Sequence, residues 1–339
     1  MNSIRNSNAS SERPPLVIIA GPTAAGKSRI AVELALRISG EIISADSMQV
    51  YRGMDIGSAK ITESEMKGVR HHLIDVLSPR EPFNIFLFRQ MAQEAAQGIL
   101  ERGHIPIVAG GTGFYIQSLL YGVAFSDEPE DRSYRKELEE KAARGMGQAL
   151  YRELEAVDPA SAAAIHPHNL KRVIRALEYS HFTGEPISVH NERERGRESE
   201  WNGAYFVLTR DRKKIYEQID RRVDQMLAAG LREEVEELMR RGMTRDMVSM
   251  QGLGYKEMID FLQGASTLEE AVYKIKRDTR HFAKRQLTWF GREKDVLWVD
   301  QDLFSSDEEV ISHMLGVLVQ RKIIDAERIN AHDTNRSDV

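Results

Sequence analysis

Short apolar runs alternate with amphipathic segments along the first 120 residues of the chain. Each run is about as long as a buried strand and is bounded by glycine, proline or polar residues. Between the runs, apolar residues recur at the spacing of a helix face. Strands are expected at 16–20, 41–45, 71–77 and within 104–115, and helices from Lys27, at 83–102 and through Leu120. This alternation predicts a parallel, doubly wound sheet with its ligand at the carboxyl ends of the strands.

The pattern changes after Gly122. Residues 123–202 are rich in Ala, Glu and Arg and have almost no β-branched runs, which predicts several short helices separated by Gly and Pro. An apolar run at 204–209 then predicts that the sheet resumes. The later elements are expected to be helices at 212–241, 256–262 and 268–290 and a last strand at 296–300.

The first strand leads into the sequence GPTAAGKS at 21–28, which has the spacing G-x-x-x-x-G-K-S. Glycines at this spacing let the backbone curl so that its N–H groups point into one concavity, at the positive end of the next helix. The lysine adds a point charge, and the serine offers a hydroxyl to Mg²⁺. The motif therefore predicts a site for a di- or triphosphate. Its expected residues are Gly21, Thr23, Ala24, Ala25, Gly26, Lys27 and Ser28, with Ser28 as the Mg²⁺ ligand.

The flanking strand and helix disfavour the alternative, a chance glycine-rich turn. Together these patterns predict an α/β protein with a P-loop NTPase-like parallel sheet core and a mostly helical inserted domain. The core is expected at 14–122 and 203–315, the helical insertion at 123–202, and flexible tails at 1–13 and 325–339.

The second acid that a P-loop ATPase or GTPase uses to hold Mg²⁺ is missing from its usual place. The strand IPIVA ends in Gly110-Gly111-Thr112 rather than in Asp or Glu. The acid at a strand end near the phosphate loop is Asp46. It is a candidate for holding the metal's water shell or for acting as a base toward an acceptor, and the alternative is a loop-capping Asp.

Three more polar side chains are candidates for the same site. Thr23 puts a hydroxyl where a leaving oxygen would lie, although local backbone bonding is the commoner role of a loop threonine. Thr112 follows a strand at the same sheet edge, and Arg222 on a later helix has the chemistry to clamp a diphosphate. An arginine on a charged helix is also often a surface residue. His71 and His72 are adjacent, point in different directions on a strand and do not form a metal pair.

Composition limits the protein's class. The chain has 339 residues, of which 41% are hydrophobic and 29% charged, as in globular domains. It has no cysteine, which excludes disulfides and thiol catalysis. No run is long enough to span a bilayer, the N-terminus lacks a hydrophobic signal, and we expect a cytoplasmic protein.

Charge is uneven along the chain. The formal net charge is −5, yet residues 271–294 carry eight Lys or Arg residues against two acids. This basic segment is either a solvated helix face or a phosphate-binding surface. Trp289 and Phe290 end its helix, and core packing is favoured over base stacking for both.

Seven motifs, in this order, resemble the tRNA dimethylallyltransferases (tRNA isopentenyltransferases). They are GPTAAGKS, DSMQVYRGMDIGSAK, HHLID, AGGTGFY, LKRVIRALE, QGLGYKE and AKRQLTWF. The resemblance covers residues 15–300 and implies transfer of the dimethylallyl group of dimethylallyl diphosphate to an adenosine amine. That adenosine lies 3′ of the anticodon in tRNAs that read codons beginning with U. The resemblance therefore implies two partners, dimethylallyl diphosphate and the anticodon stem-loop of tRNA, with Mg²⁺ as cofactor.

The resemblance assigns roles to the candidates. It implies that Asp46 takes the proton of the adenine amine, that Thr23 bonds the bridging oxygen and that Arg222 holds the diphosphate. The expected tRNA contacts are Asp46, Ser47, Met48, Gln49, Thr112, Arg132, Lys171, Arg172, Arg175, Gln251, Gly254, Lys256, Lys276 and Arg280. A stacked base cannot reach a buried prenyl donor, so extrusion of the adenosine is expected. Nothing in the sequence demands a dimer, and we expect a monomer.

Two other functions fit part of the pattern. A small-molecule or nucleotide kinase would hold ATP at Lys27 and Ser28 and would use Asp46 to activate an acceptor hydroxyl. The glycines in place of a second acid, and the helical insertion, argue against it. A nucleotide-switched RNA-binding module would not need Thr23 and Asp46 together. One departure from the family stands out: Gln218 replaces an arginine that many members carry, which leaves Arg222 alone on that helix turn.

Overall fold

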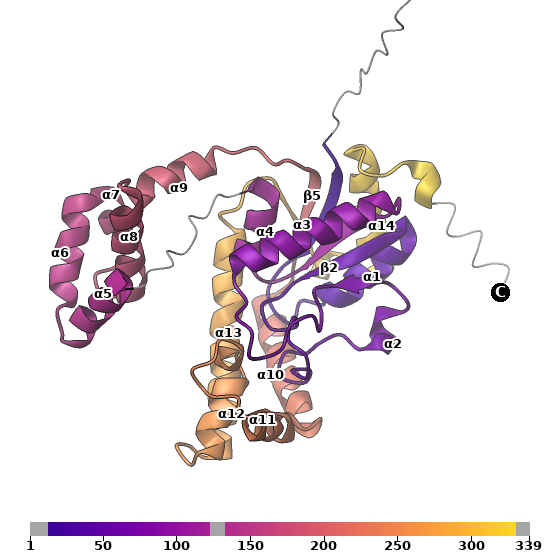
Figure 1. Ribbon diagram of the computed structural model, residues 1–339. Helices are drawn as coiled ribbons and strands as arrows, with labels where there is room; N and C mark the ends of the chain where they lie inside the picture. Colours follow the sequence, from indigo (N-terminus) through magenta and orange to yellow (C-terminus); the bar gives the residue numbers. More distant parts are fainter. Residues whose placement is uncertain (1–12, 123–132, 330–339) are drawn as a thin grey trace, which may run out of the picture. The chain divides into compact units, whose positions relative to one another are not determined.

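A computed structural model describes residues 13–122 and 133–329 (Figure 1). The chain divides into two compact units. The core unit comprises residues up to Leu120 and from Glu200 onward, and the helical unit comprises Tyr121–Ser199. Each unit is described by itself.

The core unit is built on one six-stranded parallel sheet with the order β3-β2-β4-β1-β5-β6. The strands are β1 Pro15–Ala20, β2 Gly40–Ala45, β3 His71–His72, β4 Ile105–Gly110, β5 Asn202–Thr209 and β6 Val296–Asp300. The register pairs Gly110 of β4 with both Ala20 and Ala45. The loops that follow β1, β2 and β4 therefore leave the sheet side by side, as the sequence predicts.

Helices cover both faces of this sheet (Figure 1). On one face, α1 (Lys27–Ile38) and α14 (Asp307–Gln320) share a hydrophobic cluster with alternate strand residues such as Val17 and Ile19. On the other, α3 (Ile85–Glu101) contacts β2 and β4, and α4 (Gly113–Tyr121) follows β4. Continuous burial of β1 follows from this two-sided cover.

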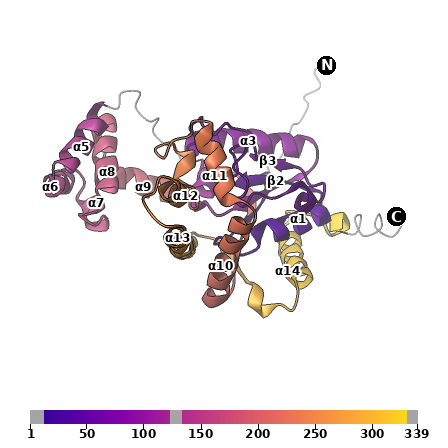
Figure 2. The same ribbon diagram turned by 90° about the horizontal axis from the view of Figure 1, so that it is seen from below.

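Four further helices form a connected group in the core unit (Figures 1 and 2). They are α10 Arg212–Ala228, α11 Leu231–Arg240, α12 Tyr255–Leu262 and α13 Leu268–Phe290. Contacts connect α10 with α11 and α13, and α12 with α11 and α13. The expected helices at 256–262 and 268–290 are confirmed. A short helix, α2 (Glu63–Met66), follows the loop after β2.

Four expectations about elements and boundaries are wrong. The strand at 71–77 has only two residues, because Leu73 and Asp75 adopt left-handed backbone angles that end pairing. The single helix at 212–241 is two helices, broken at Gly230, whose φ is 102°. Apolar side chains of α14 pack into the core, so the folded chain continues past the expected boundary at 315. The expected tail from 325 also begins in ordered structure, since Arg328 Nε donates to the carbonyl of Ile38 at 2.9 Å.

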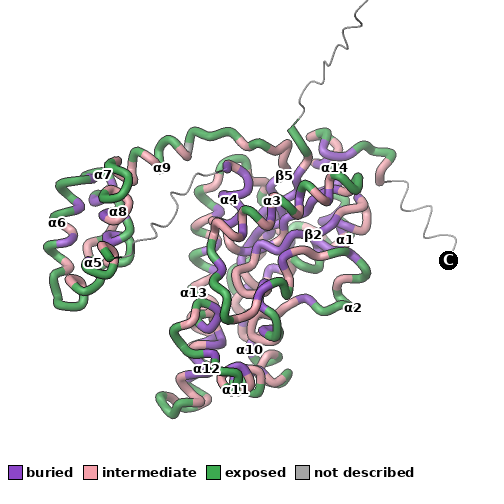
Figure 3. The backbone as a smooth tube through the Cα atoms, viewed as in Figure 1, coloured by how far each residue is buried: buried purple, intermediate pink, exposed green. Residues whose placement is uncertain are grey.

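The helical unit has its own core. It contains α5 Ser133–Ala143, α6 Gly147–Val157, α7 Pro159–Ala164, α8 Leu170–Thr183 and α9 Ile187–Arg195. Leu138, Leu154 and Leu177 belong to one buried cluster in its interior. Buried stretches of these helices are purple in Figure 3. The buried carboxylate of Asp158 caps α7 and also accepts hydrogen bonds from the backbone N–H and hydroxyl of Ser188. Within the described ranges, no helix has the length and apolar character required to cross a membrane.

Candidate active site

The phosphate loop connects β1 to α1 through backbone angles that glycine favours. Gly21 has φ of 145°, and a Cβ there would lie 2.5 Å from the carbonyl oxygen of Leu208 on β5. Gly26 has φ of 78° and immediately precedes α1. The loop therefore curls against the end of the sheet and presents the first turn of α1, as an anion site requires.

Lys27 lies over this loop, with its Nζ 2.8 Å from the carbonyl oxygen of Pro22. Burial and, to a smaller extent, nearby Arg222 lower the pKa of the Lys27 ammonium to about 8, while Asp46 opposes the shift. These interactions place the three charged residues near one another. The sequence predicted all three, from three separate segments, as members of one site.

Arg222 reaches the site from α10. Its Nη2 lies 3.4 Å from the carbonyl oxygen of Ala59, which also accepts a hydrogen bond from Gln49 Nε2 at 3.3 Å. Burial lowers the pKa of the guanidinium, and the carboxylates of Asp46 and Glu65 act in the opposite direction. An anion that binds beside this half-buried cation stabilises its charged form.

Asp46 follows β2, and its two carboxylate oxygens have different surroundings. Its Oδ1 accepts a hydrogen bond from the backbone N–H of Met48 at 2.8 Å and a longer one from Gln49 at 3.4 Å. The loop-capping role weighed from the sequence is therefore present. Among the described residues, none donates a hydrogen bond to Oδ2, so this oxygen remains available to accept a proton.

Thr112 lies between β4 and α4, next to the end of β2. Its backbone N–H donates to the carbonyl oxygen of Ala45 at 3.3 Å. A Cβ on Gly110 would collide with the same carbonyl. Glycine at position 110 thus lets β2 and β4 approach closely enough to bring Thr112 and Asp46 to adjacent positions of the sheet edge.

Two buried glutamines that the sequence patterns did not single out hold the phosphate loop. Gln286 of α13 accepts from the Thr23 N–H at 2.9 Å and donates to the carbonyl oxygen of Gly111 at 2.9 Å. Gln301, after β6, donates to the carbonyl oxygen of Ala25 at 2.9 Å. Neither glutamine has a charge or a phosphate-motif spacing that would mark it. Only the segment AKRQLTWF, quoted for the resemblance, contains one of them.

The loop after β2 is held at its far end by α11 and α12. The carboxylate of Glu234 accepts the backbone N–H groups of Asp55, Ile56 and Gly57 at 2.8, 2.7 and 3.0 Å, and the hydroxyl of Tyr255 at 2.9 Å. A Cβ at position 57 would lie 2.5 Å from the Tyr255 ring, so only glycine fits there. Sequence patterns missed this anchor because Glu234 resembles any exposed acid on a helix.

Comparison with known proteins gives a consistent result. Residues 49–293 match the family model for IPP transferase. The tRNA dimethylallyltransferase of Lachnoclostridium phytofermentans is 54% identical over 91% of this chain and 99% of the relative, and that of Geobacillus thermodenitrificans is 45% identical over 89% and 97%. The chain belongs to the tRNA dimethylallyltransferase family.

Solved structures agree with this family assignment. The full-length tRNA isopentenylpyrophosphate transferase of Bacillus halodurans is 42% identical, covers 96% of this chain and 100% of its own, and superposes with a TM-score of 0.68. A eukaryotic dimethylallyltransferase, whose structures are described as acting on tRNA, is 27% identical, covers 93% of this chain and 82% of its own, and gives a TM-score of 0.77. The expected fold class is confirmed.

Several residues expected to contact tRNA in a tRNA dimethylallyltransferase lie together in the core unit. A Cβ at Gly252 would lie 2.6 Å from Cε of Met48, so the segment 251–256 rests against 46–49. That places Ser47 and Gln251 in neighbouring segments. The side-chain amide of Gln251 bonds to the carbonyl of Arg245, and the Gly254 N–H bonds to Glu257 at the start of α12. Lys256 is 3.6 Å from Glu257.

The predicted basic surface of α13 is partly neutralised by α10. Lys276 Nζ is 2.6 Å from Asp224, and Arg280 Nη1 is 2.5 Å from Asp220. Residues 271–294 therefore present less free charge than their own sequence indicates. Phe290 is fully buried, which confirms the expected core packing for this residue, whereas Trp289 is half-buried and packs against Gly113 and Phe114.

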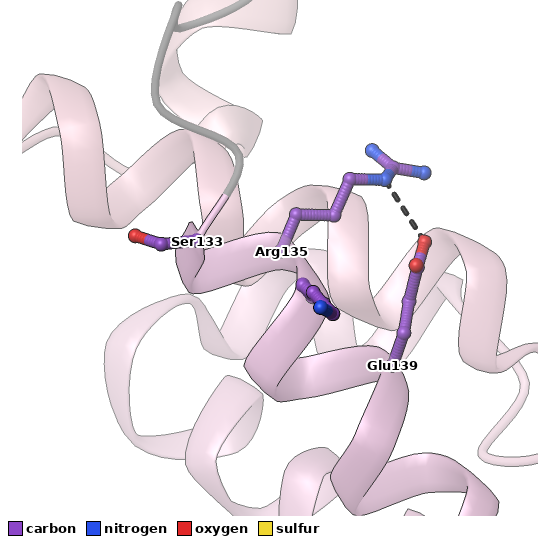
Figure 4. A pocket seen from close by; sticks show the side chains of 4 residues that line it. Ser133, Arg135 and Glu139 are labelled. Atoms are coloured by element: carbon purple, nitrogen blue, oxygen red, sulfur yellow. Dashed lines mark hydrogen bonds and ion pairs between the residues drawn. The ribbon is translucent and has the colours of Figure 1, made fainter.

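The remaining tRNA candidates belong to the helical unit. Lys171, Arg172 and Arg175 lie exposed along one face of α8, whose opposite face buries Val173 and Ile174. Arg132 lies outside the described residues. A pocket on α5 (Figure 4) is lined by Ser133, Arg135, Lys136 and Glu139, none of which is a predicted site residue. Ion pairs join Arg135 to Glu139 and Glu178 there.

Proposed function

We propose that this enzyme transfers the dimethylallyl group of dimethylallyl diphosphate to N6 of the adenosine 3′-adjacent to the anticodon, in tRNAs that read codons beginning with U. The supporting observation is the convergence of Lys27 and Arg222, two cations, with the strand-end acid Asp46. A diphosphate held by the cations leaves its carbon end facing a base. The kinase alternative is not favoured, since the relatives are named tRNA dimethylallyltransferases.

In the proposed reaction, the adenine N6 forms a bond to C1 of the dimethylallyl group while the C1–oxygen bond breaks. The electron pair of that bond leaves with the diphosphate, whose growing charge Lys27 and Arg222 stabilise. Asp46 accepts the N6 proton through Oδ2, which is the oxygen not used for loop capping. The Thr23 hydroxyl bonds the bridging oxygen of the leaving group.

Mg²⁺ would be held by the hydroxyl of Ser28 together with oxygens of the diphosphate and water. Ser28 is exposed in the first turn of α1. The described residues form no cluster of three or more acidic, histidine or cysteine side chains, so phosphate and water oxygens would complete the shell, as Mg²⁺ commonly requires. When bound, the ion neutralises charge that develops on the leaving diphosphate.

We expect the enzyme to act as a monomer, since nothing in its sequence demands a dimer. We place the enzyme in the cytoplasm together with its tRNA substrate. Incubation of the protein with unmodified tRNA and either dimethylallyl diphosphate or ATP, followed by mass analysis of the nucleosides, tests the proposal. The expected result is a gain of one isoprene unit on adenosine with the first donor. Phosphate release from ATP alone, with no modified nucleoside, would contradict it.

A further inference from the structure

Gln286 occupies a position between the two loops that frame the candidate active site. Its side chain is buried, with 6% exposure, and belongs to α13, far along the chain from both loops. Through Oε1 it accepts the Thr23 N–H of the phosphate loop, and through Nε2 it donates to the Gly111 carbonyl after β4. One amide therefore links the loop expected to hold the diphosphate to the turn that carries Thr112.

The surroundings of Gln286 fit this one side chain closely. A Cβ at Gly111 would overlap the Nε2 atom of Gln286. The Thr23 N–H, which in a phosphate loop is free to point toward a ligand, is here bonded to the protein. The Thr23 N–H is therefore not available to bind phosphate, and its buried hydrogen bond to Gln286 fixes the position of Thr23.

We infer that Gln286 is a positioning residue for prenyl transfer, which holds Thr23 so that its hydroxyl meets the bridging oxygen of the departing diphosphate. The role assigned to Gln286 rests on the proposed function. It acts on the chemical step, because a hydroxyl aimed at the breaking bond stabilises the transition state more than the bound substrate. Because the Gln286 side chain is buried and its amide bonds to Thr23 and Gly111, we expect its loss to leave tRNA affinity unchanged.

The first test replaces Gln286 by methionine, which has a similar volume and makes neither hydrogen bond. The kcat for prenyl transfer is expected to fall about 10- to 100-fold, while tRNA affinity stays within about twofold of wild type. Gln97→Met is the matched control. Gln97 is exposed near the end of α3, and α3 leads into the amino end of β4, whereas the candidate site lies at the carboxyl ends of the strands. A kcat within about twofold of wild type would overturn the inference, and so would a loss confined to tRNA affinity.

A double-mutant cycle separates positioning from general damage. Gly111→Ala alone is expected to lower kcat, because its Cβ displaces the Gln286 amide. Once Gln286→Ala has removed the amide, Gly111→Ala should cost little more, so the double variant should match Gln286→Ala. Multiplicative losses would contradict a shared role.

A third test uses pH, because a general loss of stability does not restore activity at low pH. Gln286→Glu can repeat both hydrogen bonds only while its carboxyl is protonated. Its activity relative to Gln286→Met is therefore expected to rise as the pH falls from 8 to 6, and a constant ratio would count against the inference. Wild-type turnover is measured first: if wild type transfers no prenyl group, the proposed function fails, whereas variants equal to an active wild type overturn only the role of Gln286.

Discussion

At the residue scale, one carboxylate, that of Asp46, has a structural role and is proposed to have a chemical one as well. Oδ1 caps the turn at Met48, which fixes the carboxylate at the sheet edge. Oδ2 is then held in a defined place for proton transfer. The two alternatives weighed from the sequence, a capping residue and a catalytic base, are therefore compatible rather than exclusive.

Asp46→Asn should keep the cap and remove the base, because the amide oxygen still accepts the Met48 N–H. We expect prenyl transfer to fall by at least about 100-fold, with tRNA affinity and thermal stability preserved. Asp46→Ala should abolish transfer as well while tRNA still binds. Single-turnover rates with bound tRNA measure the effect, and an Asp46→Asn enzyme working at a normal rate would remove Asp46 from the base role.

Lys27 provides a pH prediction. Its pKa of about 8 means that the side chain is cationic below pH 8 and loses its charge as the pH rises through that value. Affinity for inorganic diphosphate should therefore weaken above pH 8, by up to about tenfold per pH unit. Bound diphosphate stabilises the charged form, so the complex retains the proton to higher pH.

Calorimetry at pH 7 to 9 and constant Mg²⁺ measures this effect. Lys27→Arg is the reference, because an arginine stays protonated throughout this range. The ratio of the wild-type affinity to the Lys27→Arg affinity at each pH also cancels the effect of the titration of diphosphate itself. If wild type and Lys27→Arg share one pH dependence, Lys27 does not titrate in the free site.

At the element scale, α13 serves two purposes along its length. Near its end, Gln286 and Phe290 enter the core, while Lys276 and Arg280 are paired with acids of α10. Counting charges along the segment could not reveal this pairing, because the two acids lie 52 and 60 residues earlier in the chain. The basic segment remains a candidate tRNA surface whose charge is adjusted by a neighbouring helix.

Salt dependence tests this surface. If Lys276 neutralises a tRNA phosphate, Lys276→Ala should lower the salt slope of tRNA affinity by about one unit. Asp224→Asn should have the opposite effect and strengthen binding at low salt, since it frees Lys276 from its partner. Filter binding over a range of salt concentrations measures both slopes. Unchanged slopes in both variants would remove this part of α13 from the interface.

At the scale of the whole molecule, the helical unit is an insertion whose two ends meet. The backbone N–H of Glu200 donates to the carbonyl of Leu120 at 3.3 Å, both within the core unit. An insertion that leaves and returns at one place can be removed without stretching the parent fold. The helical unit also has a hydrophobic core of its own, so its removal takes no residue from the core of the parent fold.

Replacing 121–199 by a short glycine linker should therefore leave a folded core that still binds inorganic diphosphate. Its tRNA affinity should fall, by about tenfold or more, because the exposed basic residues of α8 are lost with the insertion. Lys171→Ala with Arg172→Ala in the full chain is the matched comparison and should weaken tRNA binding in the same direction. A shortened protein with full tRNA affinity would exclude the helical unit from recognition.

The sequence alone determined the parallel sheet, the phosphate loop and the position of Asp46 at the end of a strand, because each depends on local periodicity or on a short motif. The tertiary structure decided what holds them. Gln286, Gln301 and Glu234 act through hydrogen bonds to distant backbone groups, and such contacts leave no periodic or charge pattern in the chain. The neutralised α13 surface likewise depends on acids of α10, a helix that lies beside α13 only in the folded chain.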